Sequence, residues 1–344
     1  MIHINHASNA VSAKARTLYG RRLSDKDYAY LCECKNVSEI AAYLKAETHY
    51  GKYLPSFHNI QIHRGMLETL VRKSFYEECS ALCKYEITVG DFFYRYIIDV
   101  LEINDVLKFL TLLSAGKNGD FEYTAPVYID RHSNMDLNSL KNVSTYEQLL
   151  RAAYNTPYYD IFANHPPKDG VYDLALIECE LNNSLYDSVI ATINRHTHGE
   201  EKKQLNRLFG NMLSAKNLDV IYRLKKYYNM SEKNIYKLML NHSSMSKKQL
   251  DALINADSEL DFYNILNMTS LGRKLRAIMS DNSLTDSMTV FKESTSLIRR
   301  SSYPSVVLAS YLFLSEIEVT NVFNIIEGVR YNASPEIIKE MLIK

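Results

Sequence analysis

The segment that most resembles a reactive site in this chain is a turn of small residues with a lysine. Residues 114–119 read SAGKNG, and such a turn can surround a phosphate group with backbone N–H groups and a lysine ammonium. The segment lacks the first glycine of that motif and the Ser or Thr that should follow its lysine. We therefore predict a helix stop at Gly116 followed by a turn.

The cysteines could in principle hold a metal ion. They are Cys32 and Cys34, Cys79 and Cys83, and Cys179. An odd number of cysteines favours free thiols in a reducing compartment. A metal site would have to recruit His49, His58 or His63, but structural zinc ligands normally stand two residues apart around a turn. Buried structural thiols are the better interpretation.

Other patterns of catalysis do not occur in the sequence. There is no dinucleotide-binding glycine motif, no Gly-x-Ser-x-Gly elbow and no His-Glu-x-x-His. Carboxylate pairs such as Glu77 and Glu78 lie in polar helical runs, as solvated helix faces do. We expect no catalytic residue, no cofactor, no cofactor-binding residue and no metal ligand.

Three charged residues occupy similar places in the long apolar helices that we predict. Glu102, Lys216 and Glu318 each lie three residues before a short Asp/Asn-Val marker. Glu318 shares a helix face with Val322 and other apolar residues, where a lone charge is costly. We hypothesise that these side chains form charge pairs between helices or lobes. Solvated positions are the alternative.

The elements that position these residues are predicted to be helices. Apolar residues recur at spacings of three and four, while glycine (11) and proline (7) are scarce. Long helices are expected from Gly90 to Gly116 and from Pro304 to about Arg330, and the second is apolar nearly all round and thus central. The segment 121–129 has a strand-like composition, but we interpret it as an extended connector. Expected N-caps are Ser38, Ser144 and Ser258.

Composition narrows the class of protein. With 344 residues, 46% of them hydrophobic, the chain can bury sizeable cores. The 40 basic and 40 acidic residues cancel, which argues against a general nucleic-acid binder. No uninterrupted apolar run reaches the length of a membrane span, and residues 1–5 do not resemble a signal sequence. These features predict a soluble intracellular protein that contacts membranes only through partners.

The same short pattern occurs twice in the chain and, in weaker form, a third time. Residues 35–38 and 141–144 both read KNVS and open helix-like runs, and a fainter copy begins at 257–259. The Asp/Asn-Val markers at 105–106, 219–220 and 321–322 follow in the same order. A period of about one hundred residues suits a small domain. The repeats predict an all-α protein with three similar helical lobes, over 1–116, 117–230 and 231–344.

Several segments resemble the C subunit of archaeal and bacterial A/V-type rotary ATPases, which is equivalent to the d subunit of eukaryotic V-ATPase. The opening residues 13–18 (AKARTL) and 22–28 (RLSDKDY) resemble that family, as does the step 48–51 (THYG). The closing residues 311–322 (YLFLSEIEVTNV) and 335–338 (PEII) are the most specific. The resemblance covers essentially the whole chain and is weakest between residues 120 and 210.

The resemblance implies a pseudo-threefold funnel that sits on the cytoplasmic face of a membrane rotor ring and receives a central shaft. Such a protein is not an enzyme. It joins the shaft subunits of a soluble motor to the ring subunits that carry ions through the membrane, as a peripheral part of a membrane complex. The family supplies no catalytic residues that could be transferred to this chain.

Two other functions and one contact surface were considered. An all-helical protein-binding scaffold outside rotary motors fits the repeats equally well, and an enzyme with an unrecognised site is the third option. The basic residues Arg16, Arg21 and Arg22 could face the ring or shaft, in which case charge reversal should lower assembly without unfolding the lobe. Pairing with local carboxylates such as Asp25 is the simpler interpretation.

Overall fold

The computed structural model describes residues 6–55, 62–86, 89–121, 133–276 and 286–344. Within these ranges the regular structure is helical, and the extended pairing is limited to one isolated bridge between Lys168 and Val171. The predicted all-α class is therefore confirmed for the described residues. The expected connector at 121–129 lies outside them, apart from Phe121.

The chain divides into two compact units. The first unit combines residues 1–91 with residues 290–344, and the second comprises residues 92–289. The helices α5 (Gly90–Ser114) and α15 (Asp286–Arg300) carry the chain from one unit to the other. Residues near both ends of the chain thus share one core.

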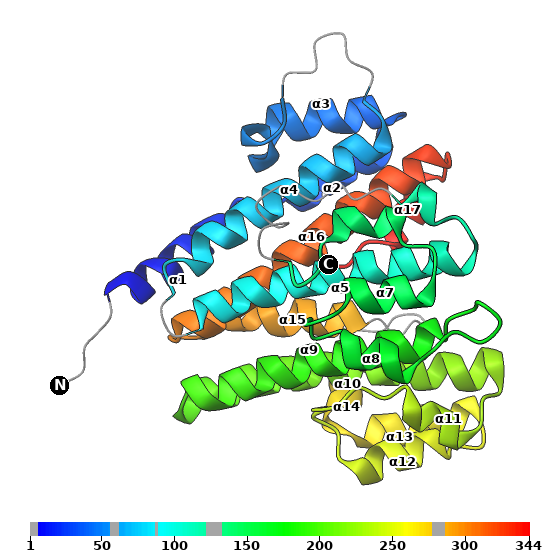
Figure 1. The fold of residues 1–344 in the computed structure, drawn as a ribbon. Coiled ribbons are helices and arrows are strands. Elements are labelled where there is room, and N and C mark those ends of the chain that lie inside the picture. Colours follow the sequence, from blue (N-terminus) through cyan, green and yellow to red (C-terminus); the bar gives the residue numbers. More distant parts are fainter. Residues whose placement is uncertain (1–5, 56–61, 87–88, 122–132, 277–285) are drawn as a thin grey trace. The chain divides into compact units, whose positions relative to one another are not determined.

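The first unit is built around one long helix, α16 (Pro304–Arg330), which packs against α1 and α4 (Figure 1). The other elements of this unit are α1 (His6–Tyr19), α2 (Asp25–Glu33), α3 (Val37–Glu47), the 3-10 helix η1 (His49–Lys52), α4 (Arg64–Cys83) and α17 (Pro335–Glu340). Pro304 occupies the first turn of α16, where its missing N–H has no intrahelical partner to lose. The predicted bounds of this helix are confirmed.

The apolar character of α16 is explained by its burial. The helix is long and apolar enough to cross a membrane, but 78% of its most apolar window is buried inside the protein. The core helix of a soluble protein passes the same test. Its Val322, Ile325 and Ile326 contribute to a core shared with α2, α3 and α4, as the all-round apolar pattern predicts.

The second unit begins with most of α5, which ends as predicted. Gly116 has φ +67°, and the N–H groups of Gly116 and Lys117 bond to the carbonyls of Leu113 and Leu112. This is a helix C-terminal motif that favours glycine, so the SAGKNG segment is a helix stop.

The remaining elements of the second unit are helices of very different lengths. They are η2 (Asn118–Asp120), η3 (Leu137–Asn142), α7 (Tyr146–Ala152), α8 (Tyr159–Asn164), α9 (Leu174–His196), α10 (Gly199–Tyr228), α11 (Glu232–Lys237), α12 (Lys247–Ile254), α13 (Glu259–Met268) and α14 (Ser270–Arg276). Apolar residues of α10 to α14 form a core of their own, which includes Ile221, Leu253 and Phe262.

Helix starts were predicted correctly at only one of the three serines. Ser258 caps α13 by accepting from the N–H of Asp261. At the other two sites a neighbouring residue is the cap: Asn36 for α3 and Thr145 for α7. Asn and Thr side chains satisfy the same orphan N–H groups as Ser, so the pattern indicates a helix start but not which polar residue caps it.

A tight turn after α3 recurs after α13. The hydroxyls of Thr48 and Thr269 donate to the carbonyls of Leu44 and Leu266. Three residues after each threonine stands a glycine whose missing side chain lets two backbone segments touch. A Cβ on Gly51 would clash with the carbonyl oxygen of Lys45, and one on Gly272 with that of Leu266.

We predict that Gly51→Ala and Gly272→Ala each lower the free energy of unfolding by about 1–3 kcal/mol, because the backbone carbonyl they meet cannot move aside as a side chain could. Urea denaturation of each variant measures the change. Gly65→Ala is the matched control, since a Cβ at Gly65 meets nothing within 4 Å. A change no larger than that of the control would show that the turn is not closely packed.

Candidate functional site

Several polar contacts in the described part of the first unit converge on Glu318. This residue lies in the middle of α16, and its side chain is only 3% exposed. A carboxylate in such a place must be paired and hydrogen-bonded, since burial of a lone charge is costly. The contacts of Glu318 therefore determine how the surrounding segments can be arranged.

The segment between α1 and α2 supplies the first partners. The Arg22 guanidinium donates from Nε to Oε2 of Glu318 at 3.1 Å, and the backbone N–H of Leu23 donates to the same oxygen at 2.9 Å. Arg22 lies 296 positions before Glu318 in the sequence. The hypothesis of a charge pair is confirmed for Glu318, although Arg22 lies in the connection between α1 and α2 and not on a helix.

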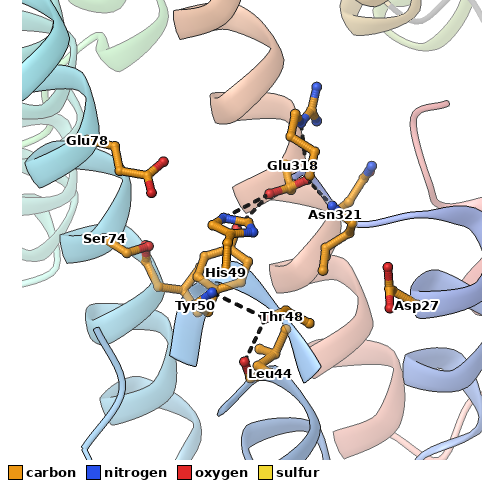
Figure 2. A network of polar contacts seen from close by, with 12 residues as sticks. Asp27, Leu44, Thr48, His49, Tyr50, Ser74, Glu78, Glu318 and Asn321 are labelled. Carbon is orange, nitrogen blue, oxygen red and sulfur yellow. Dashed lines mark hydrogen bonds and ion pairs between the residues drawn. The ribbon is translucent and has the colours of Figure 1, made fainter. Parts of the chain in front are cut away.

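The second set of partners comes from η1. The Tyr50 hydroxyl donates to Oε1 of Glu318 at 3.2 Å, and Nε2 of His49 lies 3.4 Å from that oxygen. Figure 2 shows both side chains pointing toward Glu318. Thr48 makes this possible locally, because its hydroxyl accepts from the N–H of Tyr50 and so starts η1 directly after α3.

A second polar residue of α16 holds the end of the chain. Asn321 accepts from the N–H of Ile343 at 2.8 Å and donates to the carbonyl of the same residue at 2.8 Å. It also donates to the Tyr28 hydroxyl at 3.4 Å. Burial, followed by the nearby Glu318 carboxylate, raises the pKa of both Tyr28 and Tyr50.

Glu78 on α4 makes a separate, smaller set of contacts with the same central helix. It accepts from the Tyr311 hydroxyl at 2.8 Å and from the Tyr53 hydroxyl at 3.1 Å. Figure 2 places Glu78 and Ser74 on the neighbouring helix. Glu78 thus links α4 and the residue after η1 to α16.

The second unit contains an equivalent of the Glu318 site at Glu102. This α5 side chain is 1% exposed, and it accepts from the backbone N–H groups of Asn134 at 2.9 Å and Met135 at 2.6 Å. The Asn134 amide adds a third bond at 2.9 Å. Because these donors are neutral, burial raises the pKa of Glu102. Glu102 is therefore buried as expected, but it is held by amides instead of a cation.

Lys216, the third charged residue of the pattern, does not occupy a comparable place. Its position is half-buried, whereas Ser214, two residues earlier, is fully buried. The Ser214 hydroxyl accepts from the N–H of Ser244 at 2.8 Å. The Asp/Asn-Val marker lies three residues after the buried acceptor in α5 and α16. In α10 it lies two residues further on, so counting back from the marker leads to Lys216 instead of Ser214. Because a serine is uncharged and common, nothing in the sequence marks Ser214 as a buried acceptor.

The basic residues near the N-terminus do not form one surface cluster. Arg22 contacts Glu318, and Arg16 donates to the carbonyls of Ile298 at 2.8 Å and Ser301 at 2.6 Å. Arg21 remains exposed. Arg22 therefore pairs with a distant carboxylate and not with a local one such as Asp25. Charge reversal at Arg22 is expected to disturb the fold, because it would place two carboxylates against each other in the core.

The five cysteines are free thiols, and Cys34 is the half-buried one. Cys32, Cys79, Cys83 and Cys179 are buried, and burial raises the pKa of Cys179 to about 11. Such thiols carry little thiolate at neutral pH and are poor nucleophiles. Within the described ranges, no group of three or more His, Cys, Asp or Glu residues is arranged to hold a metal ion; His58 lies outside those ranges.

A surface pocket of about 230 Å³ lies between the end of α10 and the start of α13. Within it Lys226 donates to Glu259 at 3.1 Å and to the Tyr222 hydroxyl at 2.6 Å. Hydrogen bonds from Tyr222 and Lys226 lower the pKa of Glu259, and those to Tyr222 and Glu259 raise the pKa of Lys226. Both groups are thus held in their ordinary charged forms, which does not suit acid–base catalysis near neutral pH.

These observations define a helical protein whose buried polar groups join segments of its own chain. Comparison with known proteins gives the family. Residues 11–341 match the ATP synthase (C/AC39) subunit family, and the chain belongs to it.

Relatives agree with this assignment over most of the chain. The C subunit of the A-type ATP synthase of Pyrococcus abyssi is 24% identical over 96% of this chain and 89% of its own length. That of Methanocaldococcus jannaschii is 22% identical over 97% of this chain and 85% of its own length. That of Methanosarcina mazei is 25% identical over 70% of this chain and 62% of its own length.

Replacing Glu318 by alanine is expected to lower the free energy of unfolding by about 3–5 kcal/mol, because Arg22 and the N–H of Leu23 would stay buried without an acceptor. Glu318→Gln keeps one acceptor oxygen and should cost less. Chemical denaturation measures both values, with Glu340→Gln on the exposed side of α17 as the control. An alanine variant as stable as the wild type would contradict the structural role of Glu318.

Glu102 is expected to make stability depend on pH in one direction. Its folded-state pKa is raised, so its contribution to stability is fully present below the unfolded-state pKa and is lost as the pH rises through the folded-state value. The stability of the wild type minus that of Glu102→Gln should therefore fall as the pH rises above the ordinary glutamate pKa of about 4. Denaturation at several pH values tests this, and a difference that rises with pH would refute it.

Proposed function

We propose that this chain is the C subunit of an A-type ATP synthase, a non-catalytic adaptor that couples the central shaft of the soluble motor to the membrane rotor ring. The observation that carries the proposal is the family match over residues 11–341. The relatives in Pyrococcus abyssi and Methanocaldococcus jannaschii support it, because the similarity runs through nearly the whole length of this chain and most of theirs.

The physical character of the described residues suits such an adaptor. A part that transmits torque must keep its shape under load, which favours close-packed helices with fixed register. Glu318 and Glu102 each join segments of the chain by buried hydrogen bonds, and Glu78 does so by a partly buried one. These contacts stabilise one arrangement of the chain and leave the outer helix faces for partner subunits.

The proposal includes an arrangement of three similar helical lobes around a funnel. The sequence repeats assign these lobes to 1–116, 117–230 and 231–344. The equivalent surroundings of Glu102 and Glu318 support a common design for at least two of them. In this proposal the funnel receives the shaft, and the opposite side rests on the ring.

The proposed location follows from these partners. The protein is peripheral, on the cytoplasmic side of the cell membrane, and touches the membrane only through the ring subunits. It needs no nucleic acid and no cofactor. The zero net charge of the chain suits a protein that must contact several different partners without a dominant field of one sign.

Reconstitution with purified shaft and ring subunits tests the proposal. We expect this chain to bind both, and we expect a complex that lacks it to hydrolyse ATP without moving ions into vesicles. Adding the chain back should restore transport, whereas adding the same chain after heat unfolding should not. Binding to neither partner would exclude the adaptor role and favour a scaffold outside rotary motors.

A further inference from the structure

The long helices α5, α10 and α16 each carry one buried acceptor that does the same task. The acceptors are Glu102, Ser214 and Glu318, and they receive the backbone N–H groups of Met135, Ser244 and Leu23 at 2.6, 2.8 and 2.9 Å, respectively. Each of these N–H groups lies one or two residues ahead of a helix N-cap. The caps are Asp136 for η3, Ser246 for α12 and Ser24 for α2.

A second polar position follows three residues later on the same helices. Asn321 bonds both backbone groups of Ile343 at 2.8 Å. Asn217 bonds both backbone groups of Leu240, at 2.9 and 2.8 Å. Asp105 stands at the corresponding place on α5. The pair of an acceptor and an Asn three residues later therefore has the same two functions in α10 and α16.

The ends of α10 and α16 agree as well. Asn229 and Asn332 both adopt left-handed backbone conformations, with φ of 43° and 53°. Two residues later, Ser231 and Ser334 begin α11 and α17. This agreement supports the correspondence between the two helices to within one residue. The equivalence of Ser214 and Glu318 rests on the contacts themselves, because Asn217 and Asn321 each lie three residues after the acceptor and each bond both backbone groups of one residue.

The turns that reach the acceptors also correspond. Thr48 and Thr156 both accept from the N–H two residues later, which belongs to Tyr50 and Tyr158. The Tyr50 hydroxyl bonds Glu318, and the Tyr158 hydroxyl is hydrogen-bonded with Glu102. A hydrogen-bonded tyrosine therefore completes both carboxylate sites.

We infer that each long helix is a clamp for the group of helices that follows it in the chain, and that α16 is the clamp for the group that begins at Leu23. Glu102, Ser214 and Glu318 are the positioning residues of these clamps. The repeat is therefore cyclic, because the C-terminal helix α16 accepts the backbone N–H group ahead of the N-terminal group of helices, as α5 and α10 do for the groups that follow them. In the proposed lobes 1–116 and 117–230 the long helix is the last element, so each clamp joins the end of one lobe to the helices of the next.

The physical basis is the need of a buried N–H group for an acceptor. The three N–H groups precede helix caps, where the backbone is not yet helical and cannot pair with itself. A side chain fixed on a packed helix provides an acceptor at one defined place, and so sets where the next helix begins. Either a carboxylate or a hydroxyl can do this, which explains why the residue type differs between α10 and the other two helices.

Hydrogen exchange of the full-length chain tests the assignment of each acceptor. In Glu318→Leu we expect the amide of Leu23 and those of α2 to exchange at least about tenfold faster, while those around Met135 and Ser244 keep their rates. Glu102→Leu should act on Met135 and η3 alone. Ser214→Ala should act on Ser244 and α12 alone. Glu318→Gln should retain most of the protection, because it keeps an acceptor. The inference would be overturned if one variant accelerated amide exchange equally in all three groups, or if it left exchange unchanged in the group that its acceptor holds.

Circular permutation tests the cyclic repeat even where a core variant fails to fold. One permutant joins residue 344 to residue 1 by a flexible linker and opens the chain between residues 280 and 281, which separates two clamped groups. A matched permutant opens between residues 126 and 127, which separates α5 from the group that it holds. We expect the first to keep cooperative unfolding close to that of the wild type, and the second to lose stability. The reverse order, or failure of the first alone, would refute the cyclic arrangement.

Discussion

The structure of the first unit depends on the burial of one carboxylate. Glu318 lies inside the apolar helix α16, where its charge is tolerated only while Arg22, Leu23 and Tyr50 stay in reach. An apolar residue at this place could pack against its neighbours in many arrangements. The carboxylate is compatible with few arrangements, and it thereby fixes the N-terminal segment and η1 to the C-terminal helix. Buried polar groups can select one arrangement in this way at some cost in stability.

Much of the fold follows from local features of the sequence. Pro304 marks the start of α16 and Gly116 the end of α5 because both residues have backbone requirements that act at their own position. The burial of Glu318 was also foreseeable, since it shares a helix face with Val322. Its partner was not: Arg22 is 296 residues away, and no local pattern distinguishes it from Arg21. Ser214 was missed because the sequence does not distinguish a buried serine from an exposed one.

The family assignment and the described contacts concern the same part of the chain. The match to the ATP synthase (C/AC39) subunit family runs through residues 11–341, and in this member the buried polar groups hold the chain together. Burial raises the pKa of Tyr28, Tyr50 and Cys79 above their ordinary values, as is expected of side chains packed inside this core.

The chemical difference between Glu102 and Ser214 has a consequence for how the molecule responds to its surroundings. A hydroxyl does not titrate in any physiological range, whereas a carboxylate that is buried among neutral amides takes up a proton more readily than one in water. A fall in pH would therefore change the charge at the α5 joint and leave the α10 joint as it was. Two joints built on the same plan therefore differ in whether their charge can change with pH.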